Sequence, residues 1–112
     1  MIVTIKKSKA QGKITAPPSK SVAHRALICG ALTRGSKIDN IEYSNDIVAT
    51  LNCLTTLGAK IKINDSIIEC GQLNPFVSGE ATLDCRESGR TLRFMIPLVF
   101  LAGSKITLTG SE

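Results

Sequence analysis

The sequence predicts an α/β fold of the α+β kind. The fold is built from repeated β-α-β-α-β-β units, one complete and a second truncated. Short strand-like runs alternate with three segments of helical periodicity. A shift of 68 residues also places Arg25 on Arg93 and residues 35–38 on residues 103–106. Matches at one fixed offset, with the expected elements in line, indicate an internal repeat.

The first elements expected along the chain are two short strands, at residues 2–6 and 12–16, with a turn at Gly12. Pro17 and Pro18 then stop regular structure, because proline fixes φ and lacks a backbone N–H. A helix is expected over residues 21–34, ending at Gly35, with a strand at 36–41 after it. Its apolar residues recur near helical spacing and are Ala26, Leu27, Ala31 and Leu32.

Ser44 or Asn45 is expected to cap a second helix, which has Asp46 in its first turn and Gly58 as its stop. The apolar face of that helix is formed by Ile47, Leu51 and Leu54. The elements expected after it are a hairpin of residues 60–63 and 67–70, a strand at 81–85, a third helix at 89–102 and a strand at 106–109. Pro97 is expected to kink or shift the third helix.

The composition favours one modest domain with an anionic partner. The 112 residues carry a net charge of +5, from 14 Lys and Arg against 9 Asp and Glu. Such a balance suits nucleic acid, acidic lipid or phosphorylated metabolites. Proteins that grip single-stranded nucleic acid usually stack bases on aromatic side chains, and this chain has no Trp and one Tyr. Small anions are therefore favoured over nucleic acid.

The four cysteines form no C-x-x-C pair, and His24 is the single histidine, so no metal site is expected. Cys29 and Cys53 fall on the apolar faces of expected helices. Buried, reduced thiols in a reducing compartment are therefore favoured over disulfides. The amino terminus lacks the apolar region of a secretory signal, and no apolar run is long enough to span a bilayer. We expect a cytoplasmic protein without a membrane partner.

Two short motifs carry the chemistry. In the first, Ser19 and Ser21 stand at a helix start, Lys20 adds a charge, and Arg25 lies one turn deeper on the face of Ser21. A helix N-terminus with an Arg fork suits a phosphate or carboxylate. The alternative is a serine cap with solvated cations, and the G-x-x-x-x-G-K pattern of a Walker loop is missing.

The second motif is the counterpart of the first in the repeat and covers residues 87–93. Gly89 would let a ligand approach the backbone closely at another helix start. The alternative is a tight strand-to-helix turn capped by Glu87 or Ser88. His24 is interpreted as structural or solvated rather than catalytic, and Asp46 as a helix-start residue rather than an acid or base.

Together these motifs closely resemble the start of bacterial 5-enolpyruvylshikimate-3-phosphate (EPSP) synthases, over nearly the whole chain but only about the first quarter of the family's length. The resemblance implies the enolpyruvyl transferase fold, with two lobes of three β-α-β-α-β-β units each. It also implies a division of the chain. Residues 1–17 would hold strands of the second lobe, 18–80 the first unit of the first lobe, and 81–112 a truncated second unit.

The resemblance implies transfer of an enolpyruvyl group from phosphoenolpyruvate to the 5-hydroxyl of shikimate 3-phosphate, with release of phosphate and no metal or cofactor. Lys20 resembles the lysine that contacts both substrates, and it is the one residue we interpret as catalytic. Ser21 and Arg25 resemble residues that hold shikimate 3-phosphate. Gly89 resembles the glycine beside phosphoenolpyruvate, where glyphosate also binds. The family's acid–base carboxylates lie outside these residues, so no turnover is expected of this chain alone.

One departure from the family concerns Glu87 and its neighbours. Many members have Asn-Ala-Gly-Thr where this chain has Glu87, Ser88, Gly89 and Arg90. Glu87 is expected to pair with Arg90 or Arg93 rather than face substrate, which leaves herbicide sensitivity open. The family is usually monomeric, whereas unpaired strands at residues 2–6 and 12–16 would let this chain self-associate.

Three other functions remain open at this point. The related enolpyruvyl transferase that acts on UDP-N-acetylglucosamine shares the repeat architecture. A stand-alone basic module would bind phosphate groups or nucleic acid. A fragment with a folding or interaction role alone would have no ligand affinity.

Overall fold

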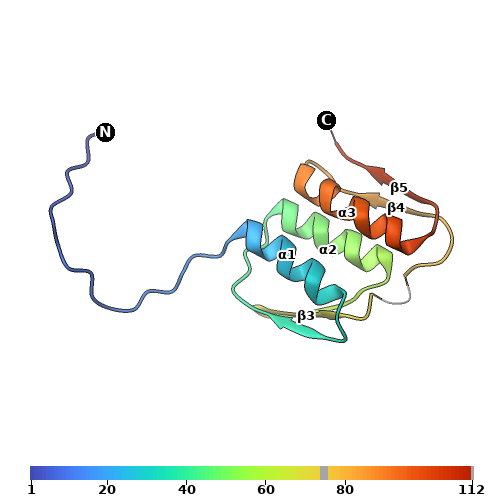
Figure 1. The fold of residues 1–112 in the computed structure, drawn as a ribbon, viewed down its shortest axis with the longest axis horizontal. Coiled ribbons are helices and arrows are strands. Elements are labelled where there is room, and N and C mark those ends of the chain that lie inside the picture. The colour runs from blue at the N-terminus through green and yellow to red at the C-terminus, as the bar shows by residue number, and fades with distance from the viewer. Residues whose placement is uncertain (74–75, 112) are drawn as a thin grey trace.

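The computed structural model describes residues 1–73 and 76–111. Three helices form a layer between two small sheets, and the amino-terminal residues extend away from this folded body (Figure 1). The mixed α/β class predicted from the sequence is therefore confirmed. The elements in chain order are α1 (Lys20–Ala31), β1 (Ser36–Ile38), α2 (Asn45–Leu57), β2 (Lys60–Asn64), β3 (Ile67–Gly71), β4 (Ala81–Asp84), α3 (Gly89–Ala102) and β5 (Ile106–Thr109).

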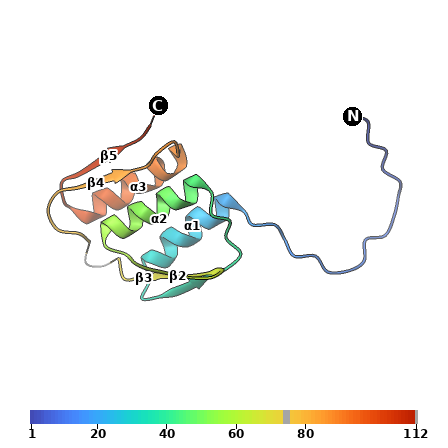
Figure 2. The ribbon, with the colours of Figure 1, turned by 180° about the vertical axis from the view of Figure 1, so that it is seen from behind.

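The two sheets differ in direction. The first has the order β1-β3-β2 and is antiparallel throughout, so that Cys70 in the central strand lies opposite Ser36 on one side and Ile61 on the other. The second contains β4 and β5, which run parallel because α3 crosses between them. Seen from behind, the two sheets lie on opposite sides of the helix layer (Figure 2).

The core lies where the helices meet the sheets. Leu27 of α1, Leu54 of α2, Ile68 of β3, Leu83 of β4 and Met95 of α3 each have 0% of their surface exposed. Burial of one such side chain contributes about 1.5–3 kcal/mol. Because these residues come from all three helices and from one strand of each sheet, the hydrophobic core joins both sheets through the helices.

The expected helices are confirmed, with one shift in length. α2 and α3 begin and end where local signals place them, at the caps Ser44 and Ser88 and at Gly58 and Gly103. α3 runs without interruption through Pro97. α1 ends at Ala31 rather than at residue 34, because the Thr33 hydroxyl donates to the Gly30 carbonyl oxygen at 2.7 Å and closes the last turn. Leu32 is consequently half-exposed instead of buried.

The strands expected at residues 2–6 and 12–16 are not formed, and this prediction is wrong for the structure in hand. Residues 1–19 are extended and exposed, and we call them the arm (Figure 1). A strand needs a neighbouring strand to satisfy its N–H and C=O groups. Before the cap Ser19, the one hydrogen bond between the arm and the body among the described residues runs from Asn40 Nδ2 to the Ala16 carbonyl oxygen, at 3.3 Å. Ile2 and Ile14 remain 96% and 93% exposed.

The cysteines follow the prediction except at one position. Cys53, Cys70 and Cys85 are buried free thiols, and burial raises the pKa of the Cys53 thiol to about 12. Cys29 is exposed, so its placement on the apolar face was wrong. It lies two residues beyond Leu27, about 200° around the helix, whereas the buried face of α1 follows Leu27.

Two features are absent from the described residues, 1–73 and 76–111. None of these residues belongs to a helix that is long and apolar enough to cross a membrane. None belongs to a group of three or more His, Cys, Asp or Glu side chains placed to hold a metal ion.

Candidate functional site

The three helices run in the same direction and begin at one end of the body, where the arm leaves it (Figures 1 and 2). Each is capped in the same way, by a serine hydroxyl that accepts a backbone N–H in the first turn. Ser19 accepts from Val22, Ser44 from Ile47 and Ser88 from Thr91. The remaining first-turn N–H groups and the three helix dipoles all favour negative charge at this end. We call it the N-terminal face.

Lys20 and Asp46 join two of these termini. The Lys20 ammonium lies 2.8 Å from Asp46 Oδ2, with the side chains 52% and 30% exposed. The bond from Lys20 holds the pKa of the Asp46 carboxyl below its ordinary value. Such a half-exposed pair is worth about 0–1 kcal/mol, so a bound anion could displace the carboxylate from Lys20. Asp46 stands in the first turn of α2, as expected, and also neutralises the charge of Lys20.

A buried chain of side-chain hydrogen bonds ties the three helices together beneath this face. His24 Nδ1 of α1 lies 2.7 Å from the Thr50 hydroxyl of α2, which lies 2.8 Å from the Thr91 hydroxyl of α3. Thr91 is 2.7 Å from the cap Ser88 and 3.3 Å from the Asp46 carbonyl oxygen. These linked hydrogen bonds fix the first turns of α1 and α3 relative to each other.

The directions of these bonds determine the tautomer of His24. Thr91 uses its one hydroxyl proton toward Ser88 or the Asp46 carbonyl, so Thr50 donates to Thr91. Thr50 must then accept from His24 Nδ1–H. Nε2 is left without a partner in the described part of the chain. His24 is fully buried, which agrees with the interpretation of a structural residue.

His24 should make the stability of the fold depend on pH. Burial, followed by the charges of Arg90 and Lys20, lowers its pKa below 6.5, although Asp46 opposes this. The unfolded chain therefore takes up a proton before the folded one does as the pH falls. The contribution to stability is complete above the unfolded pKa and is lost progressively as the pH falls from there through the lower pKa of the folded state.

Urea titrations from about pH 7.5 to about pH 5.5 should thus show a falling free energy of unfolding. Because His24 is the single histidine, the His24→Gln variant should show a nearly flat profile over the same interval. An equal slope in both proteins would contradict the assignment.

The structure places the predicted site residues on or next to the N-terminal face. The Ser21 hydroxyl accepts from Arg25 Nη1 at 3.1 Å, which confirms that the two share a helix face. Gly89 is the first residue of α3, and beyond its chain neighbours and the backbone of its own helix no atom lies within 4 Å of where a Cβ would stand. The glycine is therefore not required for packing. Lys20 and the first turn of α3 are brought together through Asp46.

Sequence reasoning missed Thr50 and Thr91, and it considered Arg90 only as a partner for Glu87. Arg90 is close enough to act on the pKa of both His24 and Asp46, and so adds another cation to the face. Thr50 and Thr91 form the buried link between helices. No local signal marks them, because their partners lie 26 and 41 residues away.

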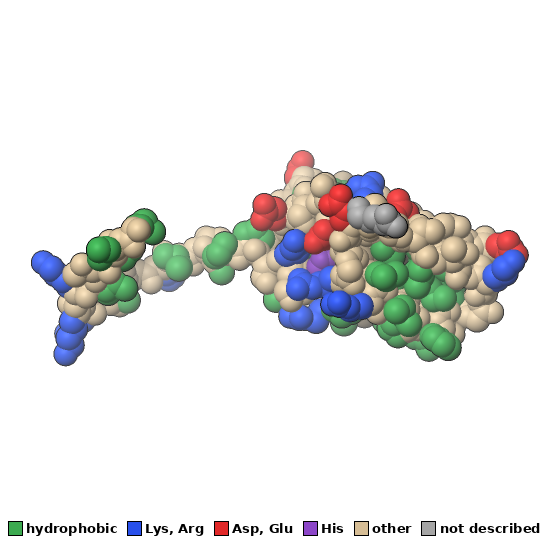
Figure 3. All heavy atoms as spheres, turned by 90° about the horizontal axis from the view of Figure 1, so that it is seen from above, with side chains coloured by type: hydrophobic (Ala, Val, Ile, Leu, Met, Phe, Trp, Pro, Cys, Tyr) green, Lys and Arg blue, Asp and Glu red, His purple; other side chains and the backbone are tan. Residues whose placement is uncertain are grey.

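The expectation for Glu87 was wrong. Within the described residues, its carboxylate makes no ion pair with Arg90 or Arg93. It lies before the cap Ser88, outside the helix, and there it lines a hollow of 210 Å³. The other lining residues are Asn45, Asp46, Arg86 and Ser111. Cations and carboxylates are accordingly mixed near this end of the body (Figure 3).

A sequence profile for EPSP synthase (3-phosphoshikimate 1-carboxyvinyltransferase) matches residues 5–112. This chain belongs to the EPSP synthase family. The resemblance seen in the two motifs is thereby confirmed over almost the full chain.

Two relatives in the EPSP synthase family show how much of the length is covered. The 3-phosphoshikimate 1-carboxyvinyltransferase of Clostridium perfringens (strain SM101) is 44% identical over 110 residues, which are 96% of this chain and 26% of the relative. That of Clostridium beijerinckii is 46% identical over 101 residues, which are 83% of this chain and 23% of the relative. The chain spans about a quarter of the length of these relatives.

A solved structure shows the same fold. EPSP synthase from Acinetobacter baumannii superposes with a TM-score of 0.71 at 22% identity, over 89% of this chain and 23% of the solved one. At that identity the likeness concerns the fold alone. It supports the arrangement of helices and sheets described above.

Proposed function

We propose that this chain supplies part of the substrate site for transfer of an enolpyruvyl group from phosphoenolpyruvate to shikimate 3-phosphate. The observation that carries the proposal is Lys20, which lies where three helix N-termini converge. Both substrates are polyanions, and their mutual repulsion must be offset before they can react. Fixed cations and helix termini provide this compensation without reorganising during the reaction.

Each predicted site residue has a role in this proposal. Lys20 leaves Asp46 and contacts both substrates, stabilising charge by position. Ser21 and Arg25 open their mutual hydrogen bond and hold the phosphate of shikimate 3-phosphate, for which an Arg fork is well shaped. Gly89, with open space before it, gives phosphoenolpyruvate access to the first N–H groups of α3. No metal or cofactor enters the reaction.

The reaction joins the 5-hydroxyl to C2 of phosphoenolpyruvate while C3 takes up a proton, and phosphate then leaves from the tetrahedral adduct. The carboxylate paired with Lys20 on the N-terminal face is that of Asp46, and the pair favours its ionised form. It is a poor general acid, because its proton is lost at low pH. We propose that acid–base groups lie elsewhere in the complete enzyme and that this chain alone shows no turnover. Phosphate release from both substrates by the purified chain would disprove the last point.

The proposal is tested by titrating the chain with shikimate 3-phosphate and following amide chemical shifts. We expect shifts centred on Lys20, Ser21 and Arg25. Shikimate, which lacks the phosphate, is the matched control and should produce much smaller shifts there. UDP-N-acetylglucosamine binding more tightly than shikimate 3-phosphate would instead favour the other enolpyruvyl transferase, and absence of shifts at these residues would refute a preformed half-site.

Three further expectations stay proposals. The division into residues 1–17, 18–80 and 81–112 is supported by the arm leaving the body beside Pro17 and Pro18, while residues 74, 75 and 112 lie outside the described residues. A cytoplasmic location is supported by the buried free thiols. Self-association is supported by exposed apolar residues on the arm and on α3, the latter being Leu92, Ile96, Phe100 and Leu101.

A further inference from the structure

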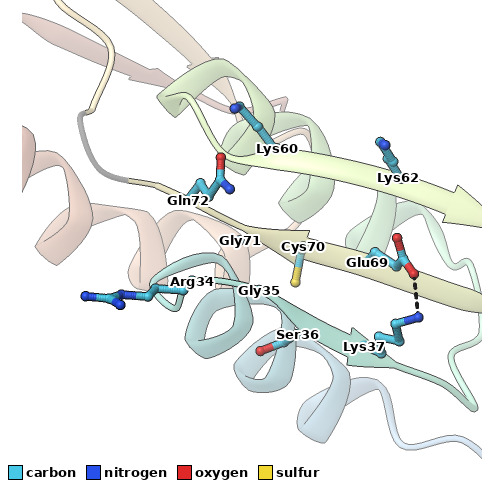
Figure 4. Close-up of a pocket in the computed structure, with 10 residues that line it drawn as sticks. All are labelled: Arg34, Gly35, Ser36, Lys37, Lys60, Lys62, Glu69, Cys70, Gly71 and Gln72. Atoms are coloured by element: carbon cyan, nitrogen blue, oxygen red, sulfur yellow. Dashed lines mark ion pairs between the residues drawn. The ribbon is translucent and has the colours of Figure 1, made fainter.

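The outer face of the three-stranded sheet carries a hollow of 360 Å³ that no residue of the N-terminal face lines. This volume falls at the lower end of the range for small-molecule sites, about 300–1,000 Å³. Figure 4 shows Lys60 and Lys62 projecting side by side from the edge strand β2. Lys37 lies on the other edge strand, β1, and Glu69 lies on the central strand β3. Arg34, before β1, also lines the hollow, and its side chain extends away from the three lysines (Figure 4).

Strand register explains why these charges share one face. Lys37, Glu69 and Lys62 form one cross-strand row, while Ser36, Cys70 and Ile61 form the next row, on the helix side. Lys37 pairs with Glu69 at 2.9 Å and lowers the pKa of that carboxyl. Arg34, Lys60 and Lys62 have no ion-pair partner among the described residues. Among the described lining residues, four cations against one carboxylate give a net charge of +3.

The floor of the hollow is backbone. A Cβ on Gly71 would stand 2.8 Å from the Gly35 α-carbon, so the two segments are in direct backbone contact there. The Cys70 side chain points away into the helix layer, where its thiol lies 3.9 Å from the Leu27 carbonyl oxygen (Figure 4). A flat floor with cationic walls leaves room for a compact anion against the backbone.

We propose that this hollow binds a small anion carrying a diphosphate group, either free or as the tail of a nucleotide. Two adjacent phosphates can contact Lys60 and Lys62 together, and Arg34 adds a further positive charge to the lining. A nucleic-acid strand fits less well, because the lining has no aromatic side chain and Glu69 interrupts the cationic surface. The site is distinct from the proposed substrate site. Arg34 follows the end of α1 and Lys20 begins it, and its 12 residues span about 18 Å.

Titration with inorganic diphosphate, followed by amide shifts, tests the proposal. Shifts should centre on Lys60, Lys62 and Gly71, saturate in the millimolar range and weaken as potassium chloride is added. Lys60→Ala and Lys62→Ala should each weaken binding about fivefold, as expected for a single charge at contact distance in water. Both lysines are exposed, so neither variant is expected to impair folding, which circular dichroism would check.

Two controls separate this site from the N-terminal face. Lys105→Ala removes an exposed, paired lysine elsewhere and should leave binding unchanged. Lys20→Ala should likewise leave the diphosphate shifts at Lys60 and Lys62 unchanged, even if it abolishes binding of shikimate 3-phosphate. The proposal is overturned if diphosphate shifts only the first turns of the helices, if Lys60→Ala and Lys62→Ala bind as the parent does, or if an oligonucleotide binds more tightly than diphosphate.

Comparing the affinities for ADP and inorganic diphosphate shows whether the hollow binds free diphosphate or the diphosphate tail of a nucleotide. Equal affinities for ADP and diphosphate would show that the phosphates alone are recognised. ADP binding more than about tenfold more tightly, a difference of roughly 1.4 kcal/mol, would assign the hollow to nucleotides.

Discussion

Replacing Thr50 with valine should lower the free energy of unfolding by about 1–3 kcal/mol, although valine nearly matches threonine in shape. The substitution removes the acceptor of His24 Nδ1–H and the donor to Thr91, both of them buried. His24 would then have neither ring nitrogen bonded, since Nε2 already lacks a partner among the described residues. A buried N–H donor without an acceptor, as His24 Nδ1–H would be, lowers stability by its full desolvation penalty. Urea denaturation measures the effect.

Two matched variants make this prediction specific. Thr55→Val removes another hydroxyl of α2, which donates to the Leu51 carbonyl oxygen at an exposed position, and should change stability little. Thr50→Ser restores the hydroxyl and should recover much of the loss. If Thr50→Val lowered the free energy of unfolding as little as Thr55→Val, the buried hydrogen bonds would not hold the helices together.

Replacing Lys20 with alanine should weaken binding of shikimate 3-phosphate by about ten- to a hundredfold. A charge-assisted hydrogen bond is worth about 1.5–3 kcal/mol, and removing the ammonium also leaves Asp46 uncompensated beside the incoming phosphate. Calorimetric or chemical-shift titration of the two proteins gives the ratio of the dissociation constants.

Asp46→Asn provides the opposite test at the same position. It keeps the side-chain size but releases Lys20 from its carboxylate partner, so affinity for the phosphate should rise. Lys105→Ala, which breaks an ion pair with Glu80 elsewhere, should leave affinity unchanged. Weaker binding in Asp46→Asn would indicate that Asp46 orients Lys20 rather than competes with the ligand.

The parts of the fold predicted from the sequence are those governed by local signals. Ser44, Ser88 and Gly58 act on backbone groups within one turn, and so the bounds of α2 and α3 could be derived from neighbouring residues. The prediction of strands in the arm failed because a strand needs a pairing partner from elsewhere in the chain. The residue pattern within 2–6 and 12–16 does not reveal whether such a partner is present. The prediction that Cys29 is buried failed because the mixed polarity of α1 is compatible with more than one buried face.

The candidate site was predicted only in its local half. Ser21 and Arg25 lie four residues apart, so helical geometry alone places them on one face. The partner of Lys20 is 26 residues away, and the link from Thr50 to Thr91 spans 41. Such contacts depend on how helices pack, which periodicity within one helix does not determine. The resemblance to a family supplied the roles of these residues, while the structure supplied their neighbours.

The parallel helices have a consequence for how the stability of this protein is measured. Three like-signed helix ends stand together on the N-terminal face and repel one another, whereas antiparallel neighbours would cancel. Any multivalent anion that settles there relieves the repulsion and stabilises the folded state by mass action. A melting temperature recorded in phosphate or sulfate buffer therefore describes a complex of protein and buffer ion. The intrinsic stability of the chain is obtained by extrapolating such measurements to zero concentration of the anion.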